Sequence, residues 1–195
     1  MKRVLLIVDP QNDFITGTLA VEGAKKKMME LAEYVKHCGD SYDYICVTLD
    51  SHPENHCSFT ENGGIWPKHC VEYSNGWQLP EYLRAALAET SKATVEVYFK
   101  GTESDQEEYS IFDNDDDGYD LRVLLEELDI QEGLRVDVCG IAGDYCVLET
   151  LKGLYQLFDN VWVLQQYTAS IDKGDKLNEY LDAKQINSVL EDVNF

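Results

Sequence analysis

Short apolar runs alternate along the chain with longer stretches whose apolar residues follow helical spacing. Five runs are typical of buried strands: 3–9 (RVLLIVD), 42–50 (YDYICVTLD), 93–100 (ATVEVYFK), 134–142 (LRVDVCGIA) and 160–166 (NVWVLQQ). Helical spacing occurs between most of them, at 23–37, 80–89, 121–128 and 146–157. This alternation predicts an α/β fold with a mostly parallel central sheet that is flanked by helices on both faces.

The length of the chain is compatible with one hydrophobic core. It has 195 residues, and 44% of them are hydrophobic. No Pro-rich or Gly/Ser-rich linker, internal repeat or low-complexity run divides it. We therefore expect a single domain over residues 1–195.

The net charge of the chain argues against some classes of binding partner. With 16 basic and 37 acidic residues the net charge is -21, which argues against nucleic acid and anionic membrane surfaces. No stretch approaches the roughly 20 apolar residues of a membrane span, and the first apolar run is too short for a signal peptide. We expect a cytoplasmic protein whose six cysteines are free thiols. A small-molecule substrate fits this composition, and a homo-oligomer is left open.

Reactive side chains stand where the predicted strands end. The first three strands end at Asp9, Asp50 and Lys100, and the fourth runs into the turn GIAGDYC, which ends at Cys146. Ligands and catalytic groups of parallel sheets gather at the carboxyl ends of the strands. Any one of these residues is explained as a surface or capping residue, but all of them together favour a functional site.

Three of these residues have the chemistry of a nucleophilic site. Cys146 stands where a strand gives way to a helix, and both a helix N-terminus and a cation such as Lys100 favour a thiolate. Asp9 can accept the thiol proton and return it to a leaving group. No histidine belongs to this set, so it does not match the cysteine–histidine pair of papain-like proteases. The alternative is that Cys146 is a packing residue.

A second set of candidate residues follows the second predicted strand. Asp50 and His52 are at alternate positions, so their side chains can point to the same side. Further potential ligands follow within twenty residues: His56, Cys57, Glu61, His69 and Cys70. Carboxylate and imidazole ligands suit zinc, iron or manganese. A polar loop with scattered histidines remains the alternative.

An acidic stretch, DNDDDGYDLRVL, begins at Asp113 and resembles the start of a calcium-binding EF-hand loop. The twelfth position, where that loop has a bidentate glutamate, is Leu124. We therefore expect an acidic turn that leads into a helix from Leu121, because negative charge is favourable at a helix N-terminus.

Six segments, taken in order, resemble the motif set of the nicotinamidases, which belong to the isochorismatase-like cysteine hydrolase superfamily. They are DPQNDF (9–14), DSHPENHCSF (50–59), WPKHC (66–70), FKGT (99–102), YSIF (109–112) and GIAGDYCV (140–147). The resemblance extends from residue 9 to residue 147. It implies a three-layer, Rossmann-like hydrolase fold.

The resemblance also implies roles for individual residues. It makes Asp9, Lys100 and Cys146 the catalytic triad. Relatives often have a cis peptide bond where this chain has Ile141 and Ala142, and the amides of Ala142 and Cys146 would then form an oxyanion hole.

The remaining residues that the resemblance assigns bind the metal and the substrate ring. Asp50, His52 and His69 would be ligands of one divalent metal ion, with zinc expected and iron or manganese as alternatives. Glu61 is our expected fourth ligand, and His56 or water is the alternative. Three aromatic residues match positions that line the ring pocket in relatives: Phe14, Trp66 and Tyr109.

The activity implied by the resemblance is hydrolysis of nicotinamide to nicotinic acid and ammonia through a cysteine thioester, as part of NAD salvage. Two alternatives stay open. The first is an isochorismatase-like hydrolase that acts on another small amide, and the second is an inactive binding protein with the same fold. The presence of the metal-loop residues favours the nicotinamidase over the first, and the complete triad favours an enzyme over the second.

Overall fold

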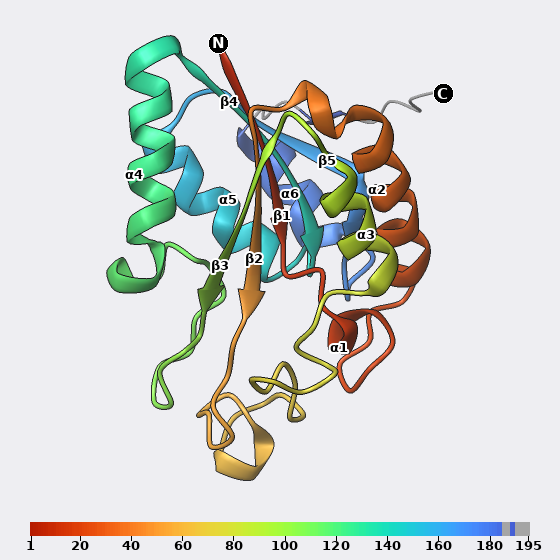
Figure 1. Ribbon diagram of the computed structural model, residues 1–195. Helices are drawn as coiled ribbons and strands as arrows, with labels where there is room; N and C mark the ends of the chain where they lie inside the picture. The colour runs from red at the N-terminus through yellow and green to blue at the C-terminus, as the bar shows by residue number, and fades with distance from the viewer. Residues whose placement is uncertain (185–187, 190–195) are drawn as a thin grey trace.

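The computed structural model describes residues 1–184 and 188–189, and its centre is a six-stranded parallel sheet (Figure 1). The strand order is β3-β2-β1-β4-β5-β6. The strands are β1 (Lys2–Val8), β2 (Tyr44–Asp50), β3 (Thr94–Lys100), β4 (Leu134–Ile141), β5 (Val161–Ala169) and β6 (Ser188–Val189). The five strands predicted from the sequence are all present, with ends that differ by at most a few residues. The α/β prediction is confirmed.

Helices cover both faces of the sheet because successive residues of each strand point to opposite sides. Leu5 and Ile7 of β1 pack in one core, which includes residues of α2 (Ala24–Cys38) and α3 (Glu81–Glu89). Val4 and Leu6 pack in a second core, beneath α4 (Asp115–Glu132), α5 (Cys146–Leu157) and α6 (Asp175–Lys184). The result is a three-layer arrangement (Figure 1).

The start of α4 corrects one prediction. The helix begins at Asp115 rather than near Leu121, so the expected acidic turn is its first turn. The side chain of Asn114 caps the helix by accepting a hydrogen bond from the backbone N–H of Asp116 at 2.9 Å. Three aspartates in the first turn face the positive end of the helix dipole, which favours this longer helix.

Three short or polar elements were not predicted. Helix α1 (Asn12–Ile15) and strand β6 are too short to show a period. Helix α6 buries only Leu177 and Leu181, one turn apart, so its apolar face is too narrow to stand out from its charged residues.

A long segment between β2 and α3 lies at the carboxyl edge of the sheet, below the strand ends in Figure 1. It contains one short 3-10 helix, η2 (Thr60–Asn62), and is held by two isolated bridges, His52 with Val71 and Phe59 with Trp66. We call residues 51–80 the metal-loop lobe. The lobe and the ends of β1, β3 and β4 enclose the candidate site.

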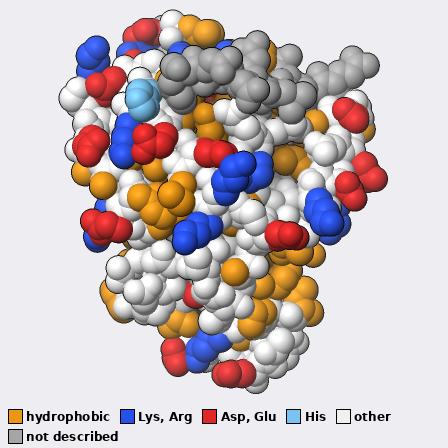
Figure 2. Space-filling model, turned by 90° about the vertical axis from the view of Figure 1, so that its right-hand side faces the viewer, with side chains coloured by type: hydrophobic (Ala, Val, Ile, Leu, Met, Phe, Trp, Pro, Cys, Tyr) orange, Lys and Arg blue, Asp and Glu red, His pale blue; other side chains and the backbone are white. Residues whose placement is uncertain are grey.

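Figure 2 shows one face of the protein, on which acidic and basic side chains are interspersed and do not form separate patches. Another 3-10 helix, η1 (Gly39–Ser41), joins α2 to β2.

Within the described part of the chain, no helix combines the length and hydropathy needed to cross a membrane.

Candidate active site

The ends of three strands bring the predicted triad together. Asp9 follows β1, Lys100 ends β3, and Cys146 begins α5. Lys100 Nζ lies 3.0 Å from Asp9 Oδ2 and 3.8 Å from Cys146 Sγ. Lys100 and Asp9 are fully buried, and Cys146 is 7% exposed. The structure therefore places a thiol, a carboxylate and an ammonium group in one buried cluster.

Lys100 also forms an ion pair with Asp50, so it serves two carboxylates. Burial lowers the pKa of Lys100, but the charges of Asp50 and Asp9 outweigh burial and hold the pKa well above its usual value. The ammonium is thus permanently charged. Because two carboxylates share this single cation, its charge cannot fully neutralise either of them.

The acid–base groups differ from the sequence-based expectation. Burial raises the pKa of the Cys146 thiol well above its usual range, and the opposing charge of Lys100 does not overcome this. Burial also raises the pKa of Asp9 to about 6, against Lys100 and a hydrogen bond from Thr48. Lys100 lowers the pKa of the thiol as expected, but in the resting site burial outweighs this effect. At neutral pH the thiol holds its proton and Asp9 is mostly ionised.

The backbone around Asp9 is shaped by a close approach between β1 and β4. Asp9 has φ 47°, in the left-handed region that aspartate tolerates better than most residues. Beside it, Gly140 has φ 128°, and a Cβ there would lie 2.0 Å from the carbonyl oxygen of Val8. Glycine is required at this position so that the end of β1 can pack against β4.

Asp50, His52 and His69 form a group suited to a metal ion. One ligand atom from each lies within 4.8 Å of the others, and all three residues are buried. The Nδ1 atoms of His52 and His69 donate to the carbonyls of Gly101 and Pro67, each at 2.8 Å. These bonds leave both Nε2 atoms as ligands and orient the rings, as is usual around protein-bound metals. One carboxylate and two imidazoles fit zinc, iron or manganese.

The two side chains considered as a fourth ligand, His56 and Glu61, lie outside this group. His56 stacks on His52 with ring centroids 3.9 Å apart, but its Nδ1 contacts Ser58 Oγ at 2.7 Å and its Nε2 contacts the Gln106 carbonyl at 2.9 Å. Both ring nitrogens are therefore in use. Glu61 is exposed on η2, and the structure does not bring it to the other three ligands.

Several residues that position the site were not predicted from the sequence. The buried side chain of Gln11 accepts from the Asp50 amide at 2.8 Å and donates to the Asp50 carbonyl at 2.8 Å and the Trp77 carbonyl at 2.9 Å. At Gly101, a Cβ would lie 2.5 Å from the His52 ring. Gln11 belongs to the DPQNDF motif and Gly101 to FKGT, so the motifs were the signal that could have identified them.

Asp13 fixes the metal-loop lobe to the rest of the protein. Its carboxylate accepts hydrogen bonds from the backbone amides of Thr18 at 3.1 Å and Cys70 at 2.8 Å. Gly76 packs so closely on this carboxylate that a Cβ there would lie 1.9 Å from Asp13 Oδ2. A single side chain thus joins three loop segments, one of which carries the metal-group residue His69.

An aromatic pocket opens above Cys146. Trp66 Nε1 donates to the Tyr109 hydroxyl at 3.1 Å, and Tyr145 packs edge-on against Trp66 with centroids 5.1 Å apart. The lining residues are Phe14, Leu19, Val21, Asp50, Trp66, His69, Glu107, Tyr109, Ala142, Tyr145, Cys146 and Ile171. The three predicted ring-pocket residues are among them. The peptide bond between Ile141 and Ala142, at the floor of this region, is cis.

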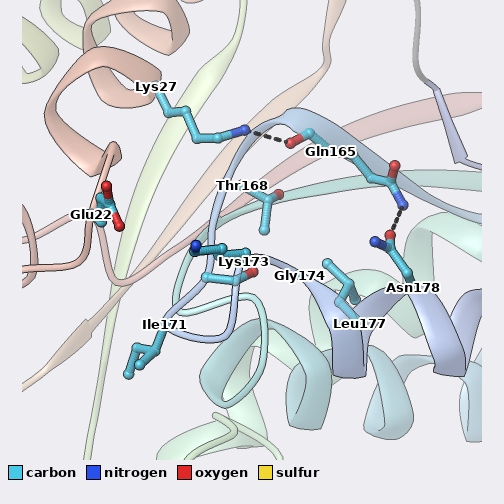
Figure 3. Close-up of a pocket in the computed structure, with 10 residues that line it drawn as sticks. Glu22, Lys27, Gln165, Thr168, Ile171, Lys173, Gly174, Leu177 and Asn178 are labelled. Carbon is cyan, nitrogen blue, oxygen red and sulfur yellow. Dashed lines mark hydrogen bonds between the residues drawn. The ribbon is translucent and has the colours of Figure 1, made fainter.

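A second cavity of about 370 Å³ lies on the other side of Ile171, between α2, β5 and the start of α6 (Figure 3). Lys27 donates to the Gln165 carbonyl at 3.1 Å, and the Gln165 side chain donates to Asn178 at 3.1 Å. Lys173 also lines this cavity. Its surface is polar and apolar in similar measure, and among the described residues Ile171 alone lines both this cavity and the pocket above Cys146.

Comparison with known protein families identifies the family of this chain. The model of the isochorismatase domain matches residues 3–193. The chain belongs to the isochorismatase family. This result confirms the family to which the motifs pointed, and it agrees with the parallel sheet and the cysteine at the start of α5.

Individual members of the isochorismatase family agree with the resemblance to nicotinamidases. The nicotinamidase/pyrazinamidase of Mycobacterium tuberculosis is 35% identical over 155 residues, which cover 77% of each chain. The nicotinamidase of Saccharomyces cerevisiae is 28% identical over 96% of this chain and 99% of the yeast protein. The crystal structure of the pyrazinamidase of Pyrococcus horikoshii in complex with zinc superposes with a TM-score of 0.77, at 33% identity over 97% of this chain and 99% of that one.

Proposed function

We propose that the chain hydrolyses nicotinamide to nicotinic acid and ammonia, in NAD salvage, through a thioester on Cys146. The observation that carries this proposal is the convergence of Cys146, Asp9 and Lys100 beneath an aromatic pocket. The names of the relatives, nicotinamidase and pyrazinamidase, supply the substrate class. An aromatic pocket with few polar groups suits a flat heteroaromatic amide.

Acylation begins with proton transfer from the thiol to Asp9. Because the resting thiol is protonated and Asp9 is mostly ionised at neutral pH, the transfer accompanies attack of sulfur on the carboxamide carbon. The amide oxygen gains the negative charge, and we assign its stabilisation to the backbone N–H groups of Ala142 and Cys146. Asp9 then gives its proton to the leaving nitrogen, and ammonia departs.

Hydrolysis of the thioester uses the same groups. Asp9, again ionised, accepts a proton from water, whose oxygen attacks the acyl carbon. The carbon–sulfur bond breaks, the proton returns to sulfur, and nicotinic acid leaves. Lys100 stays protonated throughout and balances the negative charge that moves between Asp9 and Cys146.

The residues that would hold a divalent ion are Asp50, His52 and His69, with zinc as the expected ion and iron or manganese as alternatives. When bound, the ion supplies a positive charge and a coordination point for the nitrogen of the substrate ring. Asp50 joins the two sites, because its carboxylate belongs to the metal group and also pairs with Lys100.

The alternative substrate is another small amide. An ammonia-release assay on nicotinamide, pyrazinamide, benzamide and aliphatic amides, with metal content measured on the same sample, tests the proposal. We expect nicotinamide or pyrazinamide to have the highest kcat/KM. A clear preference for an aliphatic amide, or no ammonia release from the metal-containing protein, would contradict it.

A further inference from the structure

Glu107 brings to the substrate pocket a carboxylate that the proposed reaction does not use. It lies in the loop between β3 and α4 and lines the pocket with Cys146 and Asp50. The residue is exposed to solvent. The part of its surroundings that excludes water, together with the charge of Asp50, raises the pKa of Glu107 to about 7. The Glu107 carboxyl group is therefore sensitive to charge inside the pocket.

The pocket lining contains the imidazole of His69, and Lys176 Nζ lies 4.6 Å from the ring centroid of the lining residue Tyr145. Among the described residues that line it there is no lysine or arginine. Lys100 lies beneath the pocket, where ion pairs hold its ammonium group. Lys27 and Lys173 line the neighbouring cavity (Figure 3) and not the pocket above Cys146. A ligand above Cys146 therefore meets aromatic rings, an imidazole and carboxylates.

This distribution of charge allows the pocket to distinguish a neutral amide from the corresponding anionic acid. The two have nearly the same shape, but the acid carries a negative charge at neutral pH and the amide carries none. A like charge across a partly dehydrated pocket is repelled, whereas a neutral ligand is not. A divalent ion held by the metal group would attract the acid, and the Glu107 carboxylate would oppose that attraction.

We propose that Glu107 is a specificity-determining residue that disfavours anionic ligands, including the acid product, relative to the neutral amide. This inference rests on the proposed function. It gives the pocket a substrate class, uncharged heteroaromatic amides, and it gives the product a reason to leave. The position of Glu107 in the same wall as Tyr109 lets it act on the ligand without taking part in acyl transfer.

The test compares metal-loaded Glu107→Gln with the parent protein at about pH 8, where the carboxylate is mostly ionised, and at low salt. Titration calorimetry measures nicotinate binding, and ammonia release measures the KM for nicotinamide. We expect nicotinate to bind about fivefold to tenfold more tightly to the variant, with a clearly smaller change in the KM for nicotinamide. The gain should shrink as salt is added, because screening weakens charge repulsion.

Two control variants separate charge from shape and position. Glu107→Asp keeps the charge and should keep the weak nicotinate binding of the parent. Glu103→Gln removes a charge from the same loop at an exposed position that does not line the pocket, and should change neither quantity. Unchanged nicotinate affinity in Glu107→Gln, or equal tightening of acid and amide, overturns the inference while nicotinamide turnover stands. A parent protein that neither hydrolyses nicotinamide nor binds nicotinate overturns the inference and the proposed function together.

Discussion

The two edges of the sheet bury charged groups in opposite ways. Toward the amino edge, in the first half of β4, Asp137 is 1% exposed, and both of its oxygens are satisfied. Oδ1 accepts from Arg135 at 2.8 Å, and Oδ2 accepts from Arg3 at 3.1 Å and from the Tyr42 hydroxyl at 2.8 Å. One carboxylate there has two cations, each of which reaches the surface.

At the carboxyl edge the ratio is reversed, since one cation, Lys100, serves two carboxylates. The buried Asp9 Oδ2 forms an ion pair with Lys100 Nζ at 3.0 Å, and the Asp9 side chain also interacts with the Cys146 thiol. Asp9 is therefore in place to accept the thiol proton. The contrast indicates that the amino edge is built for stability, whereas the carboxyl edge shares one cation among groups that can react.

The largest effect expected at the carboxyl edge is that of Cys146→Ala. This substitution should lower kcat/KM by at least about 10⁴-fold, because it removes the nucleophile. The free energy of unfolding should change by less than about 1 kcal/mol. Ammonia release and chemical denaturation measure the two effects. Cys139→Ala, in the middle of β4 and fully buried, is the matched control and should keep its turnover. Equal inactivation by both variants would refute the assignment.

Replacing Asp9 by Asn should lower kcat about 10³-fold, because the amide cannot accept the thiol proton. The stability should hold or rise, since Lys100 keeps Asp50 as its partner and one buried charge is gone. Alkylation of Cys146 checks that the thiol remains accessible. A kcat within a few-fold of the parent would show that Asp9 is only a cap at the end of β1.

His52→Ala should weaken metal binding by at least about 100-fold, since it removes one of three ligands. Metal analysis after dialysis against a weak chelator measures the loss, and iodoacetamide labelling should show that Cys146 still reacts. Glu61→Gln, which alters an exposed residue outside the three-ligand group, should cost less metal. Full occupancy in His52→Ala would refute the metal site, and equal losses in both variants would establish Glu61 as a ligand.

The matching substitution at the amino edge should reduce the stability of the protein rather than its activity. Asp137→Asn should lower the free energy of unfolding by about 2 kcal/mol, because it leaves two arginines without their buried partner. The kcat of the folded protein should not change. Urea denaturation and steady-state kinetics measure the pair of effects, and a fall in kcat without loss of stability would remove the distinction between the two edges.

The smallest expected effect is a shift in the pH dependence of kcat/KM. Asp9 must be ionised to accept the proton, so kcat/KM should fall as the pH drops through about 6, the value to which burial raises the pKa of Asp9. Thr48 donates to Asp9 Oδ1 at 2.7 Å and so lowers this pKa. Thr48→Val should therefore move the acidic limb to higher pH. A limb that stays in place in this variant would show that another group controls it.

The strand-end residues of the site were predictable because parallel strands place their carboxyl ends at one edge. Once the apolar runs identify the strands, Asp9, Asp50 and Lys100 are expected at that edge, and the strand order β3-β2-β1 makes their strands neighbours. The acid–base state of the thiol was not predictable in this way, because it depends on burial that the neighbours of Cys146 in sequence do not reveal. The positioning role of Gln11 could not be predicted either, because its hydrogen-bond partners, Asp50 and Trp77, are distant along the chain.

The attachment of the metal-loop lobe through Asp13 has a consequence for the dynamics of the protein. The amide of Cys70 donates to Asp13, and the Cys70 side chain packs in one of the two sheet cores, so local opening of the lobe around this residue must break both kinds of contact. Because His69 adjoins the tethered amide of Cys70, an ion bound there favours the closed lobe by mass action. Slow hydrogen exchange across the lobe would then report occupancy of the metal site at a distance from any ligand.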